Sequence, residues 1–416
     1  MRELVYFLLV LITTSIDTCP LKTVNIHSGC YCGIEIDGSN YIHCHPFSID
    51  RIPEFTRSYI HEKLNLSKNS IETLTNTSFQ QLKVKSIYLE ENPIKSIEKS
   101  TFNPHLLHYL EELYLETSSQ HSLEFLCVGS WRKLRVLKLV GFNFQKFQSC
   151  FEHFPRLEKL IIEKSTIKSI SHHISQLPFL YELSLINNHL THFNLLEDPF
   201  SSSSSIRILN LTSNQLRTIP DDLNLRLPHL ITLDLSHNRL ENIPRMNQIT
   251  SLNINLSSNL IQYFHLEDNR HFLDLSSNPI CTMEKTMPNG NVLLNNLTHV
   301  HCDCRLTAFL TANSTEQWKA FGNETICATP EVVRGIRLND LTYEELKGTC
   351  SVELPAQCKE VTNFQEIQQA SNLRSATEGH SSIYWNFNLK LFFFLFQLFK
   401  SSKNCTMILH HHHHSV

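Results

Sequence analysis

The chain has 416 residues, of which 41% are hydrophobic, and a formal net charge of −4 at pH 7. This is enough apolar material for a sizeable core, and the mixed, slightly acidic charge gives no electrostatic reason to expect a nucleic-acid partner. Charge alone therefore identifies no binding partner.

The N-terminus has the pattern of a secretory signal peptide. Arg2 precedes an apolar run from Leu4 to Ile12, and small polar residues then lead to a cleavage position at Ser15. The run is too short to span a bilayer, and the alternative interpretation is a buried N-terminal strand. We expect the signal peptide to cover residues 1–18. Export would place the 13 cysteines in an oxidising compartment, where they form disulfides.

Sequons for N-glycosylation agree with export, because a signal peptide gives the chain access to the glycosylation machinery. The expected acceptors are Asn65, Asn76, Asn210, Asn255, Asn296, Asn313 and Asn323. An eighth sequon at Asn404 would escape modification if the C-terminal segment spans a membrane.

A repeat of 19 to 26 residues runs through residues 56–281. One unit, Leu230 to Pro244, reads LITLDLSHNRLENIP, and ten units match the form LxxLxLxxNxL. Apolar spacings of three and then two residues fit no helical face, which argues against an amphipathic helical repeat. The position of the asparagine is taken in order by Asn69, Asn92, Ser118, Phe142, Ser165, Asn188, Asn214, Asn238, Asn259 and Asn278.

These offsets resemble the leucine-rich repeat in the class common among extracellular receptors. The LxL segment is a short strand whose alternation sends the two leucines inward, and stacked units bury these leucines in a shared core. The resemblance implies an α/β fold: a curved solenoid with parallel short strands on its concave face. It also implies that each asparagine amide satisfies backbone groups of adjacent coils, with lapses at Ser118, Phe142 and Ser165.

Cysteine clusters flank the repeat, and a solenoid needs caps at both ends. They resemble the cysteine-rich flanking modules of Slit-like proteins and Toll-like receptor ectodomains, although spacing alone does not choose the pairing. The resemblance implies the pairs Cys19–Cys32, Cys30–Cys44, Cys302–Cys327 and Cys304–Cys350. About twenty residues separate NPIC from HCDC, where the family keeps these elements close, so the register of the last coil is open. A zinc site at HVHCDC is the alternative, but export favours disulfides, and we expect no metal.

Cys127 and Cys150 lie at nearly the same place in the third and fourth repeats. Equivalent positions on adjacent coils lie roughly 5 Å apart, which suits a disulfide. We therefore predict a Cys127–Cys150 bridge, with two buried thiols as the alternative. Cys281 and Cys358 could pair, and Cys405 is left over.

The outward strand residues form the usual binding face of such a solenoid. Glycans on Asn65, Asn210 and Asn255 would obstruct parts of this face, which leaves repeats two to six open. Aromatic and aliphatic side chains bordered by charge are typical of binding patches, although an ordinary mixed surface would look the same. The predicted partner-binding residues are Tyr88, Glu90, Glu112, Tyr114, Glu116, Val136, Lys138, Val140, Lys159, Ile161 and Ile186.

The C-terminal region lacks the repeat. Between Tyr384 and Phe399 only Leu391 to Phe396 is unbroken apolar sequence, which is short for a spanning helix. A membrane span, a lipid-anchor signal and a free tail all remain open. The expected order of parts is a signal peptide at 1–18, an N-terminal cap at 19–55, repeats at 56–281, a C-terminal cap at 282–350, a stalk at 351–382, a hydrophobic segment at 383–400 and a polar tail with a histidine run at 401–416.

The sequence contains no GxSxG, Walker, HExxH or GxGxxG motif, so we expect no enzyme and no cofactor. The first functional hypothesis is an extracellular or cell-surface protein that binds another protein through its concave face. The alternatives are an innate-immune ectodomain or co-receptor similar to Toll-like receptors, and a structural matrix protein that resembles the small proteoglycans. The resemblance does not name the ligand, because partner choice lies in the variable outward residues.

Overall fold

The structure is a computed structural model that describes residues 29–56, 60–119, 121–143, 153–168, 174, 177–193, 204–220, 223–244, 252–264, 272–283, 292–298, 300–307 and 321–351. All of these belong to one compact unit, Met1–Glu353, and Leu354–Val416 forms the other. Apart from Ser351, the stalk, hydrophobic segment and tail expected from the sequence therefore lie outside the described residues.

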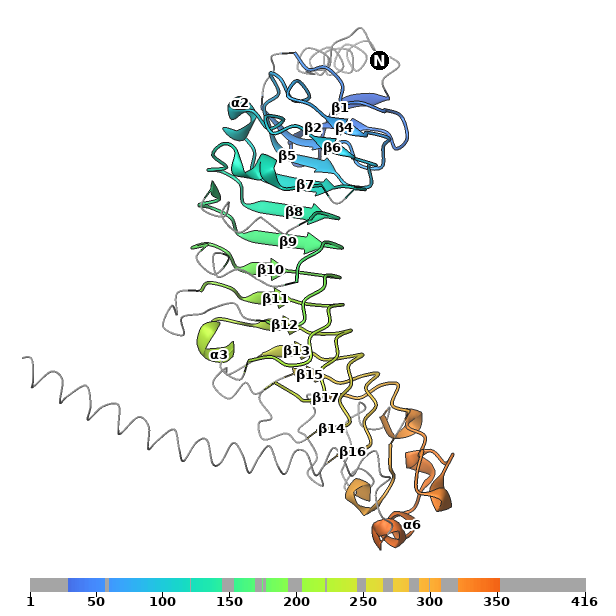
Figure 1. Ribbon diagram of the computed structural model, residues 1–416. Helices are drawn as coiled ribbons and strands as arrows, with labels where there is room; N and C mark the ends of the chain where they lie inside the picture. The colour runs from blue at the N-terminus through green and yellow to red at the C-terminus, as the bar shows by residue number, and fades with distance from the viewer. Residues whose placement is uncertain are drawn as a thin grey trace, which may run out of the picture. The chain divides into compact units, whose positions relative to one another are not determined.

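A 13-stranded sheet forms one face of the unit, with its strands in chain order (Figure 1). Every neighbouring pair is parallel except β1 and β2, which form an antiparallel hairpin. The strands are β1 (Cys30–Ile34), β2 (Asn40–Cys44), β3 (His61–Asn65), β5 (Val84–Leu89), β7 (Glu112–Glu116), β8 (Val136–Val140), β9 (Lys159–Glu163), β10 (Glu182–Ser184), β11 (Ile208–Asn210), β12 (Thr232–Asp234), β13 (Asn253–Asn255), β15 (Phe272–Asp274) and β17 (Val292–Leu293).

The remaining elements are short. Two small parallel sheets pair β4 (Thr73–Leu74) with β6 (Ser96–Ile97) and β14 (Tyr263–Phe264) with β16 (Thr282–Met283). The helices are α2 (Pro104–Leu107), α3 (Leu223–Arg226) and α6 (Tyr343–Gly348), with 3-10 turns at Glu124–Cys127, Cys304–Leu306, Glu331–Val333, Leu338–Asp340 and Thr349–Ser351. The described part is thus a leucine-rich-repeat solenoid in which little of the chain is helical.

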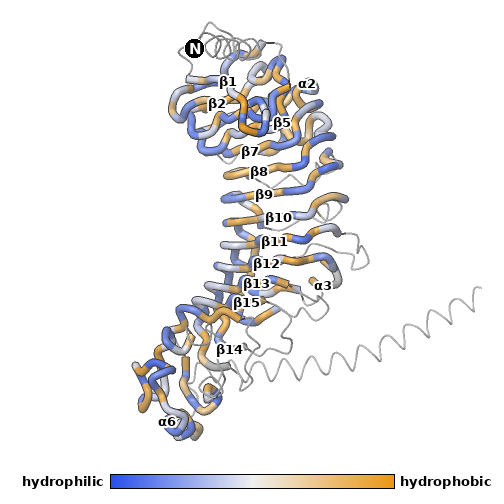
Figure 2. The backbone as a smooth tube through the Cα atoms, turned by 180° about the vertical axis from the view of Figure 1, so that it is seen from behind, coloured by the Kyte–Doolittle hydropathy of each residue, from blue (hydrophilic) through white to orange (hydrophobic). Residues whose placement is uncertain are grey.

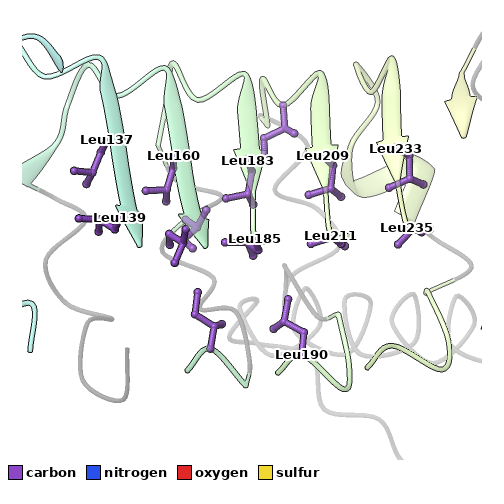
Figure 3. Packing of buried hydrophobic residues seen from close by; sticks show 14 of the residues in the cluster. Leu137, Leu139, Leu160, Leu183, Leu185, Leu190, Leu209, Leu211, Leu233 and Leu235 are labelled. Atoms are coloured by element: carbon purple, nitrogen blue, oxygen red, sulfur yellow. The ribbon is translucent and has the colours of Figure 1, made fainter. Parts of the chain in front are cut away.

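The leucines of the repeat lie where their offsets predict. In the unit around β12, Leu233 and Leu235 are fully buried and Leu230 is nearly so, while Thr232 and Asp234 between them are partly exposed. Hydrophobic segments recur on successive coils (Figure 2), and equivalent leucines of neighbouring strands stack into one continuous core (Figure 3). No coil buries its own leucines alone, so the core depends on the stack.

The asparagine ladder is present. The Oδ1 of Asn238 accepts a 3.1 Å hydrogen bond from the backbone N–H of Leu216, and its Nδ2 donates 3.0 Å bonds to the carbonyls of Leu211 and Leu235. This buried amide therefore joins its own coil to the preceding one. Where serine replaces asparagine, the Oγ of Ser165 still accepts from the N–H of Phe142 at 3.0 Å, so the lapse is partial.

In every repeat except the third, where Thr117 precedes Ser118, the turn out of the strand uses a left-handed residue just before the ladder position. Lys68, Glu91, Lys164, Asn187, Ser213, His237, Ser258 and Ser277 have φ values between 48° and 61°. In the fourth repeat this residue is Gly141, with φ 79°, and a Cβ built there would lie 2.4 Å from the carbonyl oxygen of Thr117. Because other residues adopt the left-handed conformation in the other coils, it is the close approach of the Thr117 carbonyl that requires glycine at this turn.

An additional coil follows the ten repeats. β17 pairs in parallel with β15, which aligns Leu273 with Val292. Asn296 takes the left-handed turn with φ 56°, and the next residue, Leu297, is buried at the ladder position. The residues between NPIC and HCDC that left the last register open therefore contribute one more strand to the sheet.

A row of aromatic side chains packs the core of the N-terminal half. The ring of Phe102 lies 5.7 Å from Phe79, 5.6 Å from Phe125 and 5.4 Å from Trp131. Phe142, which takes a ladder position, extends the row from Phe125 at 6.1 Å. Aromatic packing thus occupies the coils in which the asparagine ladder lapses.

Disulfides close both ends. The structure contains Cys30–Cys44 in the N-terminal cap and Cys302–Cys327 and Cys304–Cys350 in the C-terminal cap, the pairs implied by the family resemblance. Cys32, Cys127 and Cys281 are also in disulfide form. The partners expected for Cys32 and Cys127 are Cys19 and Cys150, which lie outside the described residues, so these two pairings stay predictions.

Candidate functional site

The outward residues of the sheet form three parallel rows, because the strands are in register. The central row runs from Asn65 through Tyr88, Tyr114, Lys138 and Ile161. The flanking rows contain Glu112, Val136 and Lys159 on one side, and Glu90, Glu116 and Ile186 on the other. The face of β5 to β10 therefore gathers the predicted partner-binding residues, and we call their outward surface the sheet-face patch.

Val140 is the exception. We expected it to face outward, but it is only 4% exposed. It lies in register between Glu116 and Glu163, whose longer side chains leave a valine little accessible area. Val140 therefore contributes to packing and offers no contact surface of its own.

Two tyrosines form the centre of the sheet-face patch. The rings of Tyr88 and Tyr114 stack with centroids 4.6 Å apart and an interplanar angle of 13°. Their residues are directly opposite on β5 and β7, which brings the rings together. Stacking on a rigid sheet fixes a large amphipathic surface before any partner arrives, so little side-chain entropy remains to be lost on binding.

Glu112 orders the tyrosine pair. Its Oε2 accepts hydrogen bonds from the hydroxyl of Tyr88 at 3.3 Å and from Oγ of Ser86 at 3.1 Å. Burial and the negative charge of Glu112 raise the pKa of both tyrosine hydroxyls above their ordinary value, most strongly for Tyr114. Both phenols therefore stay protonated at physiological pH and can donate hydrogen bonds.

Lys138 lies beside the tyrosines between two carboxylates. Its Nζ is 3.0 Å from Glu90 and 3.5 Å from Glu163. Burial alone would lower the pKa of Lys138, but the hydrogen bond to Glu90 and the charge of Glu163 raise it. The amine is thus charged and held in place. Glu163 was absent from the residues predicted by sequence, because nothing in the repeat pattern shows a lysine reaching across two strands.

The C-terminal half of the sheet face is different in chemistry. Its central row holds Asn210, Asp234, Asn255 and Asp274, each of which accepts a hydrogen bond from the backbone N–H two residues later. These side chains are satisfied within their own turns, as in an Asx turn. The asparagines of the sequons at Asn65, Asn210 and Asn255 thus have a structural role, whether or not they carry glycans.

The N-terminal cap extends the same face. Tyr41 and His43 of β2 align with Lys63 and Asn65 of β3, and Tyr31 lies opposite His43. The ring of Tyr31 is 5.5 Å from His43 and 5.1 Å from His45, and burial together with His45 lowers the pKa of His43. Sequence reasoning missed these residues because the hairpin lies outside the repeat. The alternation in NYIHC was the available signal.

Comparison with known proteins agrees with this architecture, although no protein-family model matches the chain. The chain is 28% identical over 280 residues to osteomodulin of Rattus norvegicus, a match that covers 62% of this chain and 60% of that protein. It is 25% identical over 291 residues to the CD180 antigen of Mus musculus, covering 68% of this chain and 40% of that one. Such relatives are extracellular leucine-rich-repeat proteins. This chain shares their repeat and has the same kind of solenoid with disulfide-bonded ends.

The leucine-rich-repeat protein spans 60% of the length of rat osteomodulin and less of CD180. Its relatives are secreted matrix or cell-surface proteins. Among solved structures, it resembles the octameric complex of Latrophilin 3, Unc5D and the leucine-rich repeats of FLRT2, with 18% identity, a TM-score of 0.51 and coverage of 78% of this chain and 99% of that one. At this identity the likeness shows the fold alone.

Two further features of the leucine-rich-repeat protein concern membranes and metals. Within the described ranges, no helix combines the length and hydropathy that a membrane span requires. In the same part of the chain, no three His, Cys, Asp or Glu side chains are grouped as metal ligands. The hydrophobic segment 383–400 and the sequon at Asn313 lie outside the described residues.

Proposed function

We propose that the protein is a non-catalytic extracellular recognition protein that binds another protein through the sheet-face patch. The observation that carries the proposal is the stacked, half-buried pair of Tyr88 and Tyr114, which Glu112 holds in place. Tyrosines that are already ordered are typical of the energetic centre of protein interfaces. The charges of Lys138 and Glu90 border the pair, as a polar rim borders an interface.

The rest of the sheet face supports this choice of location. One side-chain oxygen of each of Asn210, Asp234 and Asn255 is already hydrogen-bonded within its own turn, and Asn255 also donates to Asp234, which leaves fewer free polar groups for a partner. Glycans at Asn210 or Asn255 would restrict access further. Both effects direct a protein partner toward the strands from β5 to β10.

Two relatives suggest the biological setting. Similarity to osteomodulin favours a matrix role, and similarity to CD180 favours a cell-surface or co-receptor role. Both settings need a protein-binding face and no catalytic centre, so the sheet-face patch serves either. Release of the native protein from cells by detergent, by phospholipase or by neither would decide whether residues 383–400 span a membrane, signal a lipid anchor or form a free tail.

The test is a screen of the purified protein against an array of extracellular domains, followed by variants. Tyr88→Ala/Tyr114→Ala should weaken binding of the identified partner by at least about 2 kcal/mol, while secretion stays normal. Phe272→Ala is the matched control, because Phe272 is a 41% exposed aromatic on the same sheet outside the patch. A partner that loses affinity with Phe272→Ala and keeps it with the tyrosine variant would overturn the proposed location.

A further inference from the structure

A second charged surface lies away from the sheet-face patch, at the edge where the strands begin. α2 lies at this edge (Figure 1), and Tyr109 follows it three residues before β7. Ser86 and Val136 on the two neighbouring strands pair with Glu112. Lys83 and Lys133 lie three residues before Ser86 and Val136, as Tyr109 lies three residues before Glu112. Tyr109, Lys83 and Lys133, with His105 and His108 of the α2 turn, are called the basic edge.

The ring of Tyr109 contacts the other four residues of the basic edge. The Nζ atoms of Lys83 and Lys133 each lie 5.9 Å from the centroid of its ring, one from each neighbouring coil. The rings of His105 and His108 meet its edge at centroid distances of 5.7 Å and 4.9 Å. Cations above an aromatic face are attracted by its quadrupole, so the ring of Tyr109 favours positions of both lysine amines near it.

The lysines of the basic edge have no acidic partners in the described part of the chain. Many other lysines of the described chain are ion-paired. These pairs are Lys63 with Glu35, Lys68 with Glu91, Lys85 with Glu62, Lys95 with Glu72, Lys99 with Glu124, Lys138 with Glu90 and Lys159 with Glu182. Within the described residues no carboxylate lies within 4.0 Å of Lys83, Lys133, Arg132 or Arg156. Glu62, Glu111 and Glu158 also lie near this edge, but they pair with Lys85 and Arg135, so the unpaired charge left at the edge is positive.

The spacing of these cations suits an extended anion. Neighbouring strands lie about 4.8 Å apart, so Lys83 and Lys133, two strands apart, are separated by roughly 10 Å along the stack. Arg156 continues the line at the equivalent turn before β9, and Arg132 is exposed beside Lys133. A compact anion would need converging donors, whereas a line of cations matches charges that repeat along a chain.

We propose that the basic edge binds a sulfated glycosaminoglycan. An exported protein meets such linear polyanions outside the cell, which favours them over nucleic acid as the source of repeated negative charge. The sulfate groups lie along the row of Lys83, Lys133 and Arg156, with the ring of Tyr109 between the two lysines in the sequence of coils. Because this edge is separate from the sheet-face patch, a polysaccharide and a protein partner can occupy the molecule together.

The test is binding of the intact protein to immobilised heparin at pH 7.4. Lys83→Ala/Lys133→Ala should weaken binding by about tenfold or more and lower the salt concentration needed for elution. The control is Lys68→Ala/Lys99→Ala, which removes the same charge from exposed lysines paired with Glu91 and Glu124. This control variant should bind heparin as tightly as the unmodified protein does. Desulfated heparin should bind neither the control variant nor the unmodified protein.

Three outcomes would overturn the proposal. The first is an equal loss for both double variants, which would mean that net charge alone drives adsorption. The second is no retention of the unmodified protein at physiological salt. The third is binding to phosphatidylserine vesicles that depends on Lys83 and Lys133 while heparin binding does not, which would assign the edge to a membrane surface. Circular dichroism of each variant confirms that the solenoid is intact.

Discussion

The amide of Asn255 donates a 3.3 Å hydrogen bond to the carboxylate of Asp234 on the adjacent strand. Both side chains also accept from the N–H two residues ahead, Ser257 and Ser236 respectively. Asparagine and aspartate thus perform the same local task at this place in successive coils. The presence of a sequon in such a coil has a structural cause that is independent of glycosylation.

Asn210 allows the two roles to be separated. Its Oδ1 accepts from the N–H and Oγ1 of Thr212, at 3.0 Å and 2.6 Å. Asn210→Asp removes the sequon and keeps the acceptor, so the free energy of unfolding of enzymatically deglycosylated protein should change by less than about 0.5 kcal/mol. Asn210→Ala loses the acceptor and should cost about 1–2 kcal/mol. Denaturant unfolding measures both, and mass spectrometry before deglycosylation shows whether a glycan disappears. Equal costs for the two variants would contradict the hydrogen-bonding role.

Gly141 and Gly38 form a matched pair. Both have a left-handed φ, 79° and 85°, but a Cβ on Gly38 meets nothing within 4 Å, whereas one on Gly141 meets the carbonyl of Thr117. Gly38→Ala should therefore cost only the conformational term, about 1–2 kcal/mol. Gly141→Ala should cost at least about 1 kcal/mol more, because the backbone of the preceding coil must move. Similar unfolding midpoints for the two variants would show that the close approach is relieved at no cost.

Phe102 should be among the most sensitive core positions, because its ring contacts three other aromatic rings. Phe102→Ala leaves a cavity in the row and should lower the free energy of unfolding by about 3–5 kcal/mol. Phe179→Ala serves as the comparison, since Phe179 is 58% exposed. Chemical denaturation followed by circular dichroism measures both. A cost for Phe102→Ala no greater than that for Phe179→Ala would refute the packing role of the row.

Because of the tyrosine pair, the free energy of unfolding should fall when the pH rises into the alkaline range. Burial and Glu112 raise the pKa of Tyr88 and Tyr114, so the folded state holds these protons more tightly than the unfolded state does. The resulting stability is fully present below about pH 10, the pKa of an unfolded tyrosine, and is lost as the pH rises through the folded values. Absorbance at 295 nm should show late ionisation that Tyr114→Phe diminishes. If the absorbance titration of the unmodified protein had the same midpoints as that of Tyr114→Phe and differed only in amplitude, the expectation would be wrong.

The repeat offsets were sufficient to predict the parallel sheet, the inward leucines and the ladder of Asn238 and its equivalents. They could not predict the coil of β17, because Leu297 replaces the asparagine on which the alignment depended. The offsets also contain no information on the segments that connect one strand to the next. These segments form short helices and turns of varied length, since only the strands must keep register.

The position of the tyrosine pair could also be predicted, because the aligned repeats place Tyr88 opposite Tyr114. The ion pairs of Lys138 with Glu90 and Glu163 could not, since they depend on how far a flexible side chain reaches across neighbouring strands. The burial of Val140 likewise depends on its neighbours' lengths. Tyr41 and His43 were missed because an antiparallel hairpin continues the face without repeating the motif.

The ladder of Asn238, Asn259 and Asn278 makes the solenoid modular. Each amide joins its own coil to the one before it through the same atoms. Excising residues 239–259 would therefore bring together two ends that already carry complementary donors and acceptors. The number of coils is thus free to drift by whole units during evolution, whereas the disulfide-sealed ends have no interchangeable equivalent.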